Sequence, residues 1–137
     1  TGHNDCFYKN LDKVNNHANL VVRKFSDEIS ALLRDADLAI SRAGSGAICE
    51  LMATKTPSIL IPFPASADQH QELNAAYMAR YGGAVIVNQH DPEKAILKNT
   101  LSNLLDSDSL SEMKLNMNNY NCINSKNKLF DIINLIS

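Results

Sequence analysis

The sequence predicts an α/β fold with a mainly parallel sheet, and three observations support this prediction. Segments typical of strands alternate four times with segments typical of helices. The connections between them are short enough for strand–helix–strand units, which produce parallel sheets. Residues 57–63 are apolar rather than alternating, a pattern typical of a strand that is buried on both faces of such a sheet.

The composition limits the class of protein. At 137 residues the chain has room for one domain and not for two cores. Its 45% hydrophobic and 20% charged residues exclude a disordered or low-complexity chain. Lys and Arg number 13 against 15 for Asp and Glu, so the net charge is −2 and nucleic-acid binding is not expected. No apolar run approaches the roughly 20 residues of a membrane-spanning helix.

The cysteines and histidines give no indication of a metal site. The three cysteines are widely separated and form no C-x-x-C motif, and the four histidines show no ligand spacing. We therefore expect reduced thiols in a cytoplasmic protein, and no structural metal.

The first elements are predicted from composition and apolar spacing. Residues 5–19 predict a short helix and a loop, and the β-branched segment 19–25 predicts a strand. Ser26 is a candidate N-cap for the helix that follows. Apolar residues at i, i+3 and i+4 spacing mark that helix: Ile29, Leu32 and Leu33.

The middle of the chain predicts two strand–helix pairs. Residues 37–41 form the second expected strand, and the turn at 43–46 opens a helix. The expected buried side of that helix carries Ile48, Leu51 and Met52. The strand at 57–63 precedes a helix over about 67–80. Ser66 and Gln69 form a capping box for this helix, and Gly82-Gly83 ends it.

The last part of the chain is predicted to be mostly helical. Residues 84–87 form the fourth expected strand, and Asp91-Pro92 starts another helix, with Pro in the first turn. We expect two or three helical pieces after that. The whole chain, 1–137, is interpreted as one partial domain with a core over about 1–106 and a helical tail over about 107–137.

Polar residues that follow strands are the candidates for a binding site. An open parallel sheet binds ligands at the carboxyl ends of its strands, where the strand order switches. Three segments qualify: 25–26, 42–50 and 64–74. In the second, Gly44 and Gly46 flank Ser45 between a strand and a helix. The amides of Ser45, Gly46 and Ala47 would face a phosphate there, although many such turns bind nothing.

Two further groups have both a functional and a structural interpretation. The Glu50 carboxylate could accept hydrogen bonds from a ribose diol, or it could be a surface glutamate or an ion-pair partner of Arg42. Asp68, Gln71 and Asn74 repeat at i, i+3 and i+6 on one helix face. This row could bind carbohydrate hydroxyls, or it could be an ordinary solvated first turn.

Two motifs in combination resemble a known family. They are I-S-R-A-G-S-G-A-I-C-E-L over 40–51 and P-F-P-A-S-A-D-Q-H-Q-E-L-N-A over 62–75. They are similar to the C-terminal half of the MurG family, the bacterial peptidoglycan N-acetylglucosaminyltransferases, which have two Rossmann-like domains. Weaker similarity lies at T-G-x-N-D over 1–5 and at F-S-D-E-I over 25–29, so the resemblance covers about residues 1–90.

The resemblance implies a Rossmann-like parallel sheet flanked by helices, and an inverting transfer of GlcNAc from UDP-GlcNAc to undecaprenyl-diphosphate-linked muramoyl-pentapeptide. The backbone at Ser26 would bind the uracil edge. The diphosphate would be held by the turn at Gly44 and by the amides of Ser45, Gly46 and Ala47. Glu50 would bind the ribose, and the donor sugar would contact Gln71 and Asn74. Ala47 stands where the family often has Thr. No cofactor or metal is implied.

The resemblance also implies what to expect beyond these residues. This chain would be the donor-binding half, incomplete at its N-terminus and inactive alone. No catalytic residue is expected in it, because the family's N-terminal domain supplies the proposed base and the acceptor site. The protein would be cytoplasmic and associated peripherally with the inner face of the cell membrane.

Two alternatives remain open at this point. A two-chain eukaryotic relative adds GlcNAc to dolichol-diphosphate-GlcNAc, and its catalytic subunit resembles this half as well. The other alternative is a non-catalytic nucleotide-sugar-binding domain. It is favoured by Ala47, which lacks the hydroxyl of Thr, and by the expected absence of a base.

Overall fold

The computed structural model describes residue 21 and residues 25–64, 69–90 and 95–119. The elements in chain order are α2 (Ile29–Asp35), β1 (Ala39–Ser41), α3 (Ser45–Thr54), β2 (Ser58–Leu60), α4 (His70–Arg80), β3 (Ala84–Ile86), α5 (Ala95–Leu105) and α6 (Ser109–Asn119). The predicted helix at 5–19 and the helix start at Asp91-Pro92 lie outside the described residues. Of the predicted strand at 19–25, only residues 21 and 25 are described.

The three described strands form a parallel sheet in the order β1-β2-β3, which confirms the predicted fold class. Ile40 pairs with Ile59, and Ile59 pairs with Val85. The described strands follow one another in sequence order, so the switch in strand order that we expected does not occur among them. Their carboxyl ends still lie along one edge of the sheet, where the loops of the candidate site begin.

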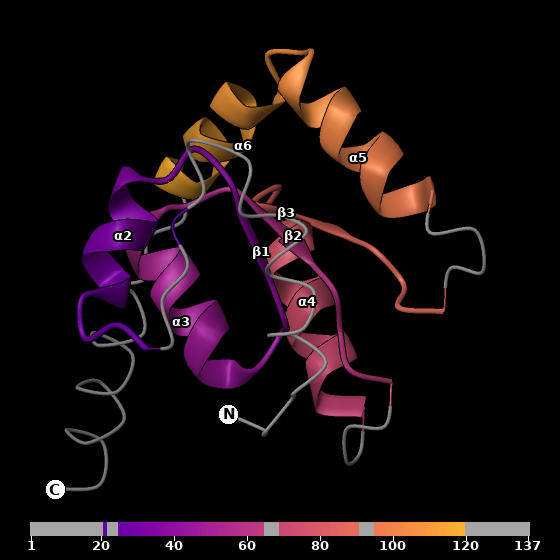
Figure 1. Cartoon of the computed structure of the whole chain (residues 1–137), viewed down its shortest axis with the longest axis horizontal. Helices are drawn as coiled ribbons and strands as arrows, with labels where there is room; N and C mark the ends of the chain where they lie inside the picture. The colour runs from indigo at the N-terminus through magenta and orange to yellow at the C-terminus, as the bar shows by residue number, and fades with distance from the viewer. Residues whose placement is uncertain (1–20, 22–24, 65–68, 91–94, 120–137) are drawn as a thin grey trace, which may run out of the picture.

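The central strand β2 is buried on both faces, as its apolar sequence predicts. Ser58, Ile59 and Leu60 are all 0% exposed. On one face Leu60 packs in a cluster with residues of α3 and α4, and these two helices lie side by side with α2 beyond α3 (Figure 1). On the other face Ile59 packs with Leu104 of α5 and Met113 of α6.

The α2 and α3 helices are joined by a buried hydroxyl. Thr56 follows α3 and is 2% exposed, and its Oγ1 donates to the Leu33 carbonyl of α2 at 2.7 Å. The hydroxyls of Thr54 and Thr56 lie 2.7 Å apart. The Thr56–Leu33 bond therefore holds the last turn of α2 against the end of α3.

Two of the predicted helix starts are wrong. The N-cap of α2 is Glu28, and Ser26 instead accepts the Glu28 N–H through its Oγ at 3.2 Å. The α4 helix begins at His70, with Gln69 as an N-cap that makes no side-chain cap bond. Gln69 has φ 56° and ψ 23°. A residue in this left-handed conformation cannot be the third residue of a helix, so it cannot complete a capping box.

The end of α4 at Gly82-Gly83 is confirmed, and α6 packs directly on it. Gly82 has φ +67°, and a Cβ at Gly83 would lie 2.7 Å from Cγ of Met117. Met117 and Met113 are buried, so the described part of the helical tail packs against the sheet. No helix within the described ranges is long and apolar enough to cross a membrane.

Candidate functional site

The N-terminus of α3 is open at the carboxyl edge of the sheet. Gly44 is its N-cap, in an extended conformation, and no side chain caps the helix. The Ile48 amide donates to the Gly44 carbonyl at 3.0 Å, so the amides of Ser45, Gly46 and Ala47 precede the first helical bond. A Cβ at Gly44 or Gly46 would meet no atom within 4 Å. An anion can therefore approach the backbone here without a side chain in its way.

The first turns of α4 are tied to the two neighbouring loops. Asn74 Nδ2 donates to the Ala43 carbonyl at 3.0 Å, immediately before the turn that opens α3. Gln71 Oε1 accepts the Phe63 N–H at 3.0 Å. The structure thus places Asn74 beside the residue that precedes the predicted phosphate turn, while Gln71 is bound to the loop between β2 and α4.

These hydrogen bonds fix which group each amide presents. Gln71 uses its oxygen as an acceptor, so its Nε2 donor is the part that can serve a ligand. Asn74 uses one of its two N–H donors, so its Oδ1 acceptor and its second N–H remain for a ligand. Both residues are half-buried. Asp68, the third member of the predicted row, lies outside the described residues.

Arg42 joins the ends of all three strands. It follows β1, and its Nη1 donates to the carbonyls of Ile61 at 3.1 Å and Pro62 at 3.4 Å, after β2. The same nitrogen donates to Gln89 Oε1 at 2.6 Å, after β3. The guanidinium carbon lies 5.6 Å from the centroid of the Phe63 ring, within the range of a cation–π contact.

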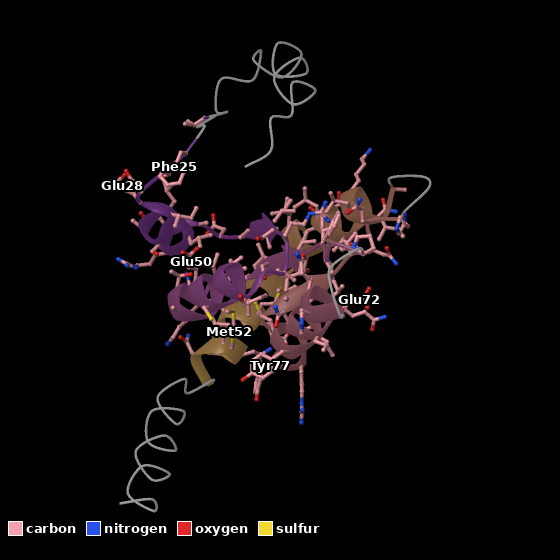
Figure 2. The ribbon with its side chains drawn as sticks, turned by 90° about the horizontal axis from the view of Figure 1, so that it is seen from below. Phe25, Glu28, Glu50, Met52, Glu72 and Tyr77 are labelled. Atoms are coloured by element: carbon pink, nitrogen blue, oxygen red, sulfur yellow. The ribbon has the colours of Figure 1, made fainter. Side chains whose placement is uncertain are left out.

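Glu50 lies on α3 and is half-buried. Figure 2 shows it in the space between α3 and α2, with Phe25 and Glu28 at the start of α2. The interpretation of Glu50 as an ion-pair partner of Arg42 is wrong, because the guanidinium is directed across the strand ends toward β2 and β3. Glu72 of α4 lies on the far side of the molecule from Glu50 (Figure 2).

Three hollows lie around this edge. The sheet-edge hollow, about 490 Å³, is lined by Ile40, Ser41, Arg42, Ile61, Val87, Asn88, Gln89 and Leu97. The proline hollow, about 340 Å³, is lined by Pro62, Pro64, Glu72, Ile86 and Asn88. The α2 hollow, about 430 Å³, is lined by Val21, Phe25, Ser26, Ile29 and Leu32. Of the predicted site residues, Ser26 is the one that lines any of these three hollows, so none of the three is lined by the α3 N-terminus.

Gln89 is not among the residues predicted from the sequence, and Arg42 is named there only as an alternative ion-pair partner of Glu50. Gln89 follows the predicted strand at 84–87, so the rule that singled out polar residues after strands would have found it. Its contact with Arg42 joins residues 47 positions apart, and no local pattern indicates such a pairing. Within the described ranges, no group of three or more His, Cys, Asp or Glu side chains could hold a metal ion.

The family model described as "Glycosyltransferase family 28 C-terminal domain" matches residues 1–134. A protein of Prochlorococcus marinus (strain NATL2A) is 75% identical over 137 residues, which are 100% of this chain and 39% of that protein. One of Synechococcus sp. (strain CC9605) is 50% identical over 126 residues, 85% of this chain and 34% of its own length. Both are named UDP-N-acetylglucosamine--N-acetylmuramyl-(pentapeptide) pyrophosphoryl-undecaprenol N-acetylglucosamine transferase.

The fold is also similar to a solved structure, the crystal structure of Acinetobacter baumannii MurG. The TM-score is 0.78 at 24% sequence identity, over 97% of this chain and 41% of that one. At this identity the match concerns the fold. The chain therefore spans about two fifths of the length of the proteins to which it is similar.

Proposed function

The chain belongs to the family of glycosyltransferase family 28 C-terminal domains, and from this membership we propose that it is the donor-binding part of an N-acetylglucosaminyltransferase. The donor is UDP-GlcNAc, and the acceptor is undecaprenyl-diphosphate-linked muramoyl-pentapeptide, a lipid intermediate of peptidoglycan synthesis. The name of a relative that is 75% identical over the whole chain supports both assignments.

One observation carries the proposal: the Asn74–Ala43 hydrogen bond. It holds the first turns of α4 beside the open N-terminus of α3. A nucleoside diphosphate sugar needs an anion site next to a group of hydrogen-bonding side chains, and this contact places the two features together.

We assign each part of the donor to a different element. The amides of Ser45, Gly46 and Ala47, at the Gly44 turn, receive the diphosphate at the positive end of the α3 dipole. Glu50 accepts hydrogen bonds from the ribose hydroxyls. Gln71 and Asn74 contact the sugar, and the backbone at Ser26 binds the uracil edge. The apolar walls of the α2 hollow, which includes Phe25 and Ile29, suit a planar base.

The role of these groups in the transfer is electrostatic and geometric. As an acceptor oxygen bonds to the anomeric carbon, the bond from that carbon to the UDP oxygen breaks and the configuration inverts. Negative charge then develops on the leaving diphosphate, which faces the amides and the dipole of α3. The proton of the acceptor hydroxyl passes to a base that we expect outside this chain, on an acceptor-binding domain.

The acceptor determines where the reaction takes place. The lipid-linked substrate named for the relatives carries an undecaprenol chain, which is held in a bilayer. We therefore propose that the protein works at the inner face of the cell membrane through peripheral association, with UDP-GlcNAc and the lipid-linked acceptor as its partners.

Calorimetry with UDP and UDP-GlcNAc tests the proposal, using the natural polypeptide that contains residues 1–137. We expect both ligands to bind, and Glu50→Ala to weaken both about tenfold or more, because the lost hydrogen bonds join a charged group to the ribose. Glu112→Ala is the matched control, since it removes an exposed carboxylate from α6. The proposal is refuted if the folded wild-type protein releases no heat with either ligand. It is also refuted if Glu50→Ala binds both ligands with unchanged affinity.

A further inference from the structure

The side chain of Arg42 spans the width of the described sheet. Neighbouring strands lie about 4.8 Å apart, so the ends of β1 and β3 are separated by about 10 Å. One nitrogen, Nη1, donates to a carbonyl of Ile61 at 3.1 Å and to Gln89 at 2.6 Å. Its two hydrogens serve these two acceptors, so the 3.4 Å contact to Pro62 is the weaker, shared one.

The β2–α4 loop is held between this guanidinium and Gln71. The centroid of the Phe63 ring lies 5.6 Å from the guanidinium carbon of Arg42. The Phe63 backbone N–H donates to Gln71 Oε1 at 3.0 Å. Phe63 is 43% exposed, so packing alone does not fix the place of its ring. Movement of Arg42 would therefore move Phe63, and with it the N–H donor to which Gln71 Oε1 is bound.

Gln71 is oriented by this loop and by its own helix. Its Oε1 is occupied by the Phe63 N–H, and this contact directs the Nε2 donor away from the loop. Farther along α4, Asn74 holds the helix to Ala43, which follows Arg42 directly. Gln71 is therefore held from two directions. Arg42 fixes the β2–α4 loop to which Gln71 is bound, and Asn74 fixes the helix α4 that carries it.

We propose that Arg42 and Gln89 form a clamp across the three strand ends, and that they act as positioning residues for Gln71 and so set the affinity for the sugar part of a nucleotide sugar. This inference rests on the proposed function. The clamp does not contact the α3 N-terminus or Glu50 in the described structure, so it acts on the sugar and not on the nucleoside diphosphate. Gln89 acts through Arg42, because its Oε1 is the closest acceptor of that guanidinium.

The experiment compares the dissociation constants for UDP and UDP-GlcNAc in the natural polypeptide that contains residues 1–137. In Gln89→Leu we expect UDP-GlcNAc to bind about three- to tenfold more weakly and UDP to bind within about twofold of wild type. Gln89→Glu should restore the sugar affinity, because its carboxylate also accepts from the guanidinium. Gln71→Ala should match Gln89→Leu, and the double variant should be no worse than Gln71→Ala.

A control variant and the contrary outcomes make the test specific. Asn118→Ala removes a hydrogen bond from Lys55 on another part of the surface and should change neither affinity. The clamp is refuted if Gln89→Leu weakens UDP and UDP-GlcNAc equally, if its effect adds to that of Gln71→Ala, or if wild type binds the two ligands equally. A wild-type protein that binds neither ligand refutes the proposed function itself.

Discussion

Replacement of Gly46 by alanine should raise the stability of the protein and lower its affinity for UDP. Gly46 is the second residue of α3, its φ is not positive, and a Cβ there would meet no atom within 4 Å. Alanine is more favourable than glycine inside a helix by about 0.5–1 kcal/mol. At roughly 4 °C per kcal/mol, the midpoint of thermal unfolding should rise by about 2–4 °C.

The loss of affinity follows from the direction of the new methyl group. Each Cα–Cβ bond of a helix is tilted toward the N-terminus, so the methyl of Ala at position 46 enters the space in front of the amides. A phosphate oxygen must come within about 2.9 Å of an amide nitrogen to accept its hydrogen bond. Loss of one such charge-assisted bond, about 1.5–3 kcal/mol, weakens binding of UDP about 10- to 100-fold.

Calorimetry with UDP and thermal unfolding measured by circular dichroism check the two effects together. Ala53→Gly is the matched control: Ala53 is an exposed residue of α3 near its other end, so the reverse substitution should lower stability by a similar amount and leave UDP binding unchanged. If Gly46→Ala binds UDP as tightly as wild type, the diphosphate does not lie at the α3 N-terminus and the reasoning is refuted.

Two predictions concern the packing that supports the site. Thr56→Val should lower the free energy of unfolding by about 0.5–1.5 kcal/mol in urea denaturation, because the Leu33 carbonyl loses one of its two donors and keeps the Ala36 N–H; an unchanged value would mean that this bond contributes nothing. Gly83→Ala should cost about 1–3 kcal/mol by overpacking against Met117. Its cost should shrink in a Met117→Ala background, and additive costs would contradict the close contact.

The sequence was sufficient for the parts of the fold that local patterns determine. The apolar segment 57–63 indicated a central strand, and the helical spacing of Ile48 and Leu51 indicated the buried side of α3, both of which are buried as expected. The element boundaries were less accurate. The expected strand at 57–63 contains a β2 of only three residues, and Pro62, which has no N–H, cannot extend the ladder.

The parts that sequence analysis missed depend on contacts between distant segments. The left-handed conformation of Gln69 has no signal in the residues around it, because glycine or asparagine is the usual residue there. The partners of Arg42 lie 19, 20 and 47 positions away. The sequence could therefore place each polar loop at a strand end, while the hydrogen bonds that connect the loops required the folded sheet.

A last prediction follows from the composition of the phosphate turn, where binding depends on backbone amides. Ala47 is half-buried in the first turn of α3. Ala47→Thr would add a hydroxyl donor beside the diphosphate and should tighten UDP binding about two- to tenfold, the range that a net hydrogen bond of 0.5–1.5 kcal/mol gives. Ala47→Val has the same shape without the hydroxyl, so in calorimetry it should show no gain. An equal gain in both variants would assign the effect to packing, and the absence of any gain in Ala47→Thr would place the diphosphate away from this turn.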